Sequence, residues 1–477
     1  MTMSATITDR QKKTALWTLV IAQFMIVLDV SIVNIALPSI QRDFALSLSD
    51  LQWLVTAYTL AFGGFLLLGG RAADLYGRRR IFLFGVTGFT LASLAIGVID
   101  EAAYMVPLRA VQGFSAAFMS PAALSFVLTL FEGQARTRAL SIWGAVSAGG
   151  ATAGLLLGGL LTTYLNWRWN FFVNVPVGLF VIYNVLRLLP AHVAEERRKN
   201  LDLPGAVLVT GGLMLLVYSL THAASWGWES SDTISLLGAS IALLILFIWN
   251  EKRARHPLMP LSFFRVGNVR GALLTQLPIT AGLFSCFFFL SQYVQNILGY
   301  TALQSGLSFL PMSLLIGTCA ALAPRIIKKI GYKPIMVVAP LLLATGLYIL
   351  AGLPVDGTYT AILPGILVIA LALGFSFISV AVAATSGVPG HESGLASGLL
   401  TTSQQVGGSI GLAILSSVAA SKTSAQLALG VPHVQALVDG FHSAFYTGMG
   451  FAILASITAF LLIRSNIRGS EAAVSAH

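Results

Sequence analysis

The sequence Gly70-Arg71-Ala72-Ala73-Asp74-Leu75-Tyr76-Gly77-Arg78-Arg79-Arg80 joins two long apolar stretches, residues 51–70 and 81–99. Gly70 ends the first stretch with a residue small enough for close helix packing, and Gly77 permits the positive φ of a tight turn. Consecutive arginines are typical of a loop on the cytoplasmic side of a membrane. We therefore predict two membrane helices joined by a short cytoplasmic loop.

The whole composition is that of an integral membrane protein. Of the 477 residues, 56% are hydrophobic and 10% are charged, and the mean hydropathy is +0.83. Soluble domains contain about 25% charged residues. Because a spanning helix needs about 20 mostly apolar residues, the sequence predicts an all-α protein with fourteen transmembrane helices near residues 16–37, 51–70, 81–99, 104–130, 139–165, 171–189, 203–221, 234–249, 271–297, 303–326, 335–353, 359–385, 395–420 and 441–463.

The basic residues predict the orientation of these helices. With the N-terminus inside the cell, all but four of the 28 Lys and Arg residues fall in cytoplasmic segments; the exceptions are Arg42, Arg109, Arg168 and Lys422. Such a bias sets membrane topology, and the even number of spans puts both termini in the cytoplasm. It also accounts for the net charge of +10 without a nucleic-acid partner.

A weak internal repeat divides the chain. A shift of 254 residues places Gly77 and Arg79 on Gly331 and Lys333, and duplicated halves are typical of transporters that rock around a central site. The predicted division is a six-helix bundle over residues 1–199, two inserted helices over residues 200–255, and a second six-helix bundle over residues 256–477.

Two charged residues fall inside predicted spans, Asp29 in the first and Arg109 in the fourth. A charge at the middle of a membrane helix costs roughly 2.5 to 3.5 kcal/mol on insertion scales, so such residues are functional candidates. Asp29, among apolar neighbours, is suited to carry a proton, or it serves only as a hydrogen-bond partner of another helix. Arg109 shares a helix face with Gln112 and Gly113; it acts as counter-ion to Asp29, orients a water for proton passage, or is structural.

Several motifs resemble one family. Residues 70–80 resemble the loop signature of the major facilitator superfamily, with Ala72 in place of the usual leucine. Residues 109–113 look like the span 4 signature of the same superfamily, and residues 28–38 and 167–178 look like signatures of its fourteen-helix drug:proton antiporters. The resemblance implies a fold with two six-helix bundles and export coupled to proton entry. Together with their position inside the spans, this makes Asp29 and Arg109 the predicted proton-coupling residues. We predict a gating or conformational role for the loop residues Gly70, Asp74, Gly77, Arg78 and Arg79.

The fifth span departs from that family in one place. Gly150, Gly154, Gly158 and Gly159 match its glycine pattern, but Leu155 stands where the family has proline. Glycines four apart form a smooth stripe that lets helices approach closely. We expect this packing, and a role in gating, without a proline kink.

Substrate contacts are predicted from aromatic and uncharged polar side chains in or beside the spans, which suit a cavity for lipophilic ligands. Each of them has packing or interfacial anchoring as its alternative role. The candidates are Trp53, Tyr58, Gln112, Gln276, Gln292, Tyr293, Gln404 and Gln405.

Other functions lack their motifs. No lysine follows a glycine, so the chain has no G-K-[ST] phosphate loop of an ATP-driven pump. The seven histidines form no H-x-x-x-H pair for a metal. We expect no enzyme activity, cofactor, metal or obligate oligomer, and predict a proton-coupled exporter of lipophilic drugs in the plasma (inner) membrane, in contact with lipid. A lipid or glycolipid flippase, or a nutrient uniporter or symporter, remains the alternative.

Overall fold

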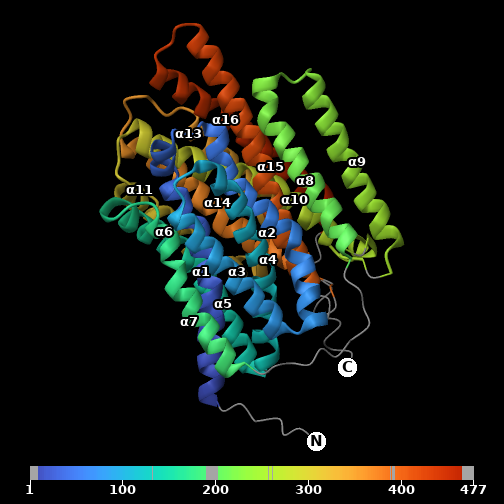
Figure 1. Cartoon of the computed structure of the whole chain (residues 1–477). Helices are drawn as coiled ribbons and strands as arrows, with labels where there is room; N and C mark the ends of the chain where they lie inside the picture. Colours follow the sequence, from blue (N-terminus) through green and yellow to red (C-terminus); the bar gives the residue numbers. More distant parts are fainter. Residues whose placement is uncertain are drawn as a thin grey trace, which may run out of the picture. The chain divides into compact units, whose positions relative to one another are not determined.

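The computed structural model describes residues 9–131, 133–189, 202–255, 257–259, 261–386, 388 and 393–464. In these ranges the chain forms helices and no strand, as the composition predicts (Figure 1). The α-helices are α1 (Asp9–Phe44), α2 (Leu48–Tyr76), α3 (Arg78–Val98), α4 (Met105–Leu130), α5 (Gly133–Tyr164), α6 (Trp169–Phe172), α7 (Asn174–Leu188), α8 (Leu203–Trp226), α9 (Ser231–Arg253), α10 (Val269–Gln292), α11 (Ala302–Ser308), α12 (Leu310–Ile330), α13 (Tyr332–Leu350), α14 (Tyr359–Thr385), α15 (Ser393–Ala428) and α16 (His433–Leu462). Short 3-10 turns cover Ala102–Tyr104 and Leu261–Arg265, and a π-helical turn, Tyr293–Ile297, extends α10.

Every predicted span coincides with helix. In the described part of the chain, twelve helical segments are long and apolar enough to cross a membrane. The other two predicted spans lie in α5 and α15, which are continuous helices of 32 and 36 residues. The helices are thus confirmed, whereas fourteen crossings and the side on which the termini lie stay predictions.

The start of α2 shows how local sequence sets a helix boundary. Ser47 precedes the helix, and its Oγ accepts a hydrogen bond from the backbone N–H of Asp50 at 3.1 Å. The Asp50 carboxylate accepts one in return from the backbone N–H of Ser47 at 3.2 Å. This capping box satisfies two amides that have no partner inside the helix.

The chain divides into two compact units. The first consists of Met1–Met214, Leu243–Leu258 and Tyr300–Leu307, and the second of Leu215–Ala242, Met259–Gly299 and Ser308–His477. Helices α8 and α9, joined by a turn at Gly227 with φ 92°, contribute to both units. The predicted division into two six-helix bundles and two inserted helices differs from these two units in its boundaries and stays a prediction.

Each unit packs its helices in the same order. In the first, α4 packs against α2 and α3, α1 against α5, and α7 against α1 and α3. In the second, α14 packs against α12 and α13, α10 against α15, and α16 against α10 and α13. The two lists correspond helix by helix, which supports the weak repeat in the sequence.

The turn between α2 and α3 has the geometry expected from the sequence. Gly77 adopts φ 95°, and its repeat partner Gly331, between α12 and α13, adopts φ 80°. Side chains rarely tolerate this region, so both positions favour glycine. Next to the turn, Arg79 donates a hydrogen bond of 2.7 Å to the carbonyl of Leu186 in the last turn of α7, where a helix end favours a cation.

Candidate proton-coupling site

A buried ion pair lies inside the first unit. The Nη1 of Arg109, on α4, is 2.6 Å from Oδ2 of Asp29, on α1. Asp29 is 0% exposed and Arg109 is 1% exposed. A buried pair of this kind stabilises a protein only if further hydrogen bonds satisfy both groups, so their other partners decide what the pair can do.

Three neutral polar side chains complete the surroundings of the carboxylate. Gln112 Nε2 donates hydrogen bonds to Asp29 Oδ1 at 2.8 Å and to Ser93 Oγ at 2.7 Å. Asn174 Nδ2 donates another to Asp29 Oδ1 at 3.0 Å. Side chains of α4 and α7 therefore bond directly to the carboxylate on α1, Ser93 of α3 accepts from Gln112 beside it, and all of these residues are buried.

The guanidinium of Arg109 is held independently of the acid. Its Nε donates to the backbone carbonyl of Leu54 at 2.9 Å, and its Nη1 donates to Gln112 Oε1 at 2.6 Å. It also lies 4.3 Å from the centre of the Tyr58 ring, in a cation–π contact. Arg109 thus keeps partners on α2 and α4 if the carboxylate becomes neutral.

The spacing of Arg109, Gln112 and Gly113 explains this geometry. Arg109 and Gln112 are one turn apart, so both side chains reach the same carboxylate. Gly113 lies against α2, where a methyl group on it would be 2.2 Å from the carbonyl oxygen of Tyr58. Only a glycine allows α4 this close to α2, and this approach brings Arg109 within reach of the Leu54 carbonyl.

Sequence reasoning found some of these residues and missed others. It singled out Asp29 and Arg109, and it assigned Tyr58 and Gln112 to substrate contacts, whereas the structure places both next to the ion pair. Ser93 and Asn174 were missed. Asn174 stands in the 167–178 motif as a polar residue in an apolar span, which is the signal that could have indicated it.

The glycines of α5 lie against α1, as the stripe predicts. A methyl group added to Gly154 would lie 2.7 Å from Ser31 Cβ, and one added to Gly158 would lie 2.8 Å from Ile32 Cγ1. A methyl group added to Gly150 would lie 3.2 Å from Val27 Cγ1.

Another face of α5 contacts α11. A methyl on Gly159 would be 2.8 Å from the Ala302 carbonyl, and one on Gly306 would be 2.4 Å from the Leu155 carbonyl. Helix α5 runs unbroken through Leu155, which is buried.

The loop motif is placed less completely. Gly70 is in ordinary contact with Pro121 of α4, at 3.6 Å for an added methyl. Arg78 is half-buried at the start of α3. The side chain of Asp74 lies outside the described part of the structure. The gating role of the motif stays a prediction.

The remaining substrate candidates are distributed as follows. Trp53 is half-buried on α2. In the second unit, Gln276 on α10 is 0% exposed, and both polar atoms of its amide have no hydrogen-bond partner among the described residues. Gln404 is half-buried and Gln405 buried on α15, which packs against α10.

Two further candidates lie where α10 passes into its π-helical turn. Gln292 is buried, and its Oε1 accepts a hydrogen bond from Asn296 at 3.1 Å. Tyr293 is also buried, and its hydroxyl donates to the carbonyl of Pro354 at 2.5 Å. This hydroxyl therefore already has a partner within the protein, whereas the side-chain amide of Gln276 has none among the described residues.

Comparison with known proteins defines the class. The chain is a polytopic membrane transporter by fold, and residues 19–412 match the model of the Major Facilitator Superfamily. The protein belongs to this superfamily. It is a multi-pass protein of the plasma membrane.

Relatives and solved structures agree with this. The chain is 41% identical to the puromycin resistance protein pur8 of Streptomyces alboniger, covering 95% of this chain and 92% of that protein. It is 39% identical to the cephamycin export protein CmcT of Amycolatopsis lactamdurans, covering 84% of each. A crystal structure of an auto-inhibited POT family peptide transporter superimposes with a TM-score of 0.67 at 17% identity, over 97% of this chain and 99% of that one, which indicates a shared fold.

The family and its structural neighbours indicate a transporter and not an enzyme. One short sequence, Gly407-Gly408-Ser409-Ile410-Gly411, has the spacing of a serine-hydrolase elbow. It lies within α15, and the Ser409 hydroxyl donates to the Gln405 carbonyl of the same helix at 2.8 Å. A nucleophile elbow requires a strand-to-helix turn, so this stretch inside a continuous helix is not an elbow, and its glycines serve helix packing.

Proposed function

We propose that the protein exports lipophilic antibiotics or similar toxic compounds from the cell in exchange for protons. The observation that carries the proposal is the buried Asp29–Arg109 pair with its ring of neutral hydrogen-bond donors. The relatives support the export direction, since their names describe puromycin resistance and cephamycin export.

The coupling follows from the contacts of the pair. When Asp29 is ionised, it ties α1 to α4 through Arg109 and to α7 through Asn174. When a proton neutralises Asp29, the ion pair is lost and Arg109 retains only its partners on α2 and α4. Proton binding therefore changes which helices are held together, and a ligand that favours one arrangement is linked to the proton through that equilibrium.

The membrane arrangement is part of the proposal. Helices α5 and α15, added to the twelve candidate spans, give fourteen crossings with both termini in the cytoplasm. In this orientation the turn at Gly77 and the hydrogen bond from Arg79 to α7 lie on the cytoplasmic side. The loop motif is then placed to control movement of α2 and α3 at that side.

Gln276 is the proposed substrate contact of the second unit. A buried polar group without a partner costs about 1–3 kcal/mol, so a fully buried amide with two such atoms indicates a place for a ligand. A lipophilic compound with one or two hydrogen-bonding groups fits this chemistry.

Transport in proteoliposomes tests the proposal. An imposed pH gradient should drive movement of a lipophilic antibiotic against its own gradient, in the direction opposite to the protons. Arg109→Lys should lose this coupling, because an ammonium cannot reproduce the planar contacts of the guanidinium. Movement of drug and protons in the same direction would indicate a symporter, and substrate that stays in the bilayer would indicate a flippase; either result contradicts the proposal.

A further inference from the structure

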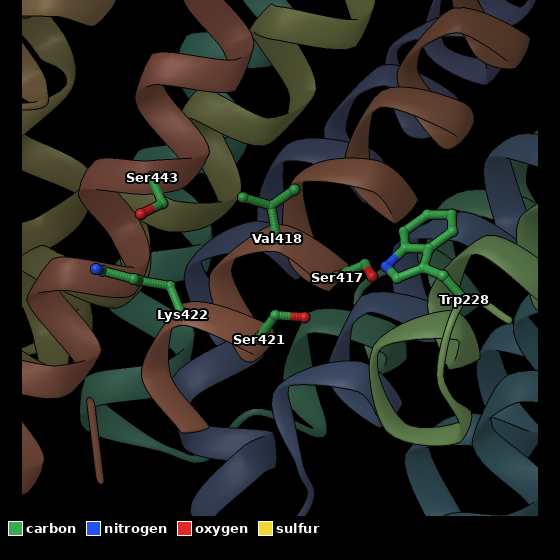
Figure 2. A pocket seen from close by; sticks show the side chains of 6 residues that line it. All are labelled: Trp228, Ser417, Val418, Ser421, Lys422 and Ser443. Atoms are coloured by element: carbon green, nitrogen blue, oxygen red, sulfur yellow. The ribbon is translucent and has the colours of Figure 1, made fainter. Parts of the chain in front are cut away.

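A cavity of about 430 Å³ lies in the second unit, apart from the candidate substrate contacts. It is formed where the turn between α8 and α9 meets the C-terminal part of α15 and the first half of α16. Figure 2 shows its lining side chains, with Trp228 and Ser417 on one side, Lys422 and Ser443 on the other, and Val418 and Ser421 between them. Ligand pockets in proteins span about 300–1,000 Å³, so this one can hold a small polar group.

Two polar side chains of the lining have no hydrogen-bond or ion-pair partner among the described residues. Ser417 is 2% exposed, and its Oγ has no hydrogen-bond partner among the described residues. Lys422 is exposed, and none of the described carboxylates forms an ion pair with it. Arg168, which shares its predicted side of the membrane, pairs with both Asp43 and Asp100. Lys422 is therefore a cation that the fold leaves available at this cavity, and the buried Ser417 hydroxyl lies on the opposite side (Figure 2).

The surroundings of the cavity are apolar. Trp228 is 52% exposed in the turn between two membrane-length helices, and tryptophan is enriched at the level of lipid headgroups. Ile234, at the start of the predicted span over residues 234–249, is also exposed. Such side chains suit contact with acyl chains.

We propose that this cavity binds the headgroup of one anionic phospholipid. Lys422 pairs with the lipid phosphate in a charge-assisted contact, and Ser421 donates a hydrogen bond to the same group. Ser417, on the other side of the cavity, donates a hydrogen bond to an oxygen of the glycerol. Trp228 and Val418 contact the glycerol and the first acyl carbons. The bound lipid bridges the α8–α9 turn to α15 and α16 within the second unit.

Native mass spectrometry of the full-length protein in detergent tests this proposal without any transport step. The protein is titrated with phosphatidylglycerol, with phosphatidylcholine of the same acyl chains, and with glycerol phosphate. We expect one phosphatidylglycerol to bind in preference to the other two. Lys422→Gln should weaken this binding about tenfold, the loss typical of a charge-assisted hydrogen bond, and Lys422→Arg should retain it.

Controls separate this site from general lipid adsorption. Lys329→Gln removes an exposed lysine of the same unit from the last turn of α12 and should leave the preferred binding unchanged. Ser417→Ala is a milder change that should weaken binding severalfold even if Lys422→Gln fails to fold. Equal binding by the wild type and Lys422→Gln, equal affinity for phosphatidylcholine, or displacement of the lipid by an equal concentration of glycerol phosphate would each overturn the proposal.

Discussion

The carboxylate of Asp29 accepts hydrogen bonds from Gln112 and Asn174 and neutralises the buried charge of Arg109. Removing one member of a buried ion pair costs about 3–5 kcal/mol because the other charge is left uncompensated. We expect Asp29→Asn and Arg109→Gln, each alone, to lower the melting temperature of the purified protein and to abolish pH-driven export. The double variant should recover much of the stability, since no buried charge remains, but not the transport.

This comparison separates coupling from folding. Thermal unfolding in detergent measures stability, and uptake into proteoliposomes under a pH gradient measures transport. If Asp29→Asn in a folded protein keeps full pH-driven export, Asp29 does not carry the proton. If the double variant is as unstable as either single one, the 2.6 Å contact does not determine their stability.

At this scale, sequence reasoning identified single residues better than their partners. Asp29 and Arg109 could be predicted because a charge inside an apolar span is costly. That Asn174 donates to Asp29, and that Ser93 accepts from Gln112, could not be predicted, because Ser93 and Asn174 lie on α3 and α7 and approach only through tertiary packing. Serine and asparagine carry no charge, so their cost in an apolar span is too small to mark them.

At the scale of the helix, the glycine stripe on α5 leads to a prediction about stability. A methyl on Gly154 would lie 2.7 Å from Ser31 Cβ and 2.9 Å from the Leu28 carbonyl, so α1 must move to admit it. Gly154→Ala should destabilise the protein by about 1–3 kcal/mol, the usual cost of overpacking. Gly317→Ala on α12 is the matched control, because nothing lies within 4 Å of its added methyl.

The control should be neutral or stabilising, since alanine exceeds glycine in helix propensity by up to about 1 kcal/mol. Thermal unfolding of both variants is the measurement. Equal melting temperatures for Gly154→Ala and Gly317→Ala would show that the contact between α1 and α5 is looser than the structure describes. A selective loss of transport with normal stability in Gly154→Ala would favour the gating role of the stripe.

Helix positions were largely predictable, whereas helix neighbours were not. Each apolar stretch coincides with helix because length and hydropathy are local properties. The turn at Gly77 was predictable for the same reason, and its φ of 95° confirms it. The contact of Gly159 with α11, which lies more than 140 residues further along the chain, depends on tertiary packing and leaves no local signal.

At the scale of the whole molecule, the two units share a packing order but not their charges. Leu283 occupies the repeat position of Asp29, so the second unit offers no corresponding carboxylate. Other acidic residues in the described membrane-length helices lie near helix ends. The proposed proton site is thus confined to one unit, and a single carboxyl group limits coupling at that site to one proton per cycle.

This asymmetry sets a charge preference for the substrate. The Asp29–Arg109 pair is neutral when the acid is ionised and carries one positive charge when it is protonated, so it offers no net negative charge to a cationic substrate, and the cost of binding rises with the charge of the substrate. A dication would remain without a counter-charge in a buried site, at a cost of several kcal/mol. We expect neutral and singly charged lipophilic compounds to be exported in preference to divalent cations.

With one proton per cycle, export of a neutral compound should move net charge and respond to membrane potential, whereas export of a monovalent cation should be electroneutral. The measurement is efflux from proteoliposomes under an imposed pH gradient, with and without a potassium diffusion potential, for a neutral drug, a monovalent dye and a divalent dye of similar size. Export of the divalent dye at the rate of the monovalent one would show that the protein supplies a second negative group, and it would contradict coupling through Asp29 alone.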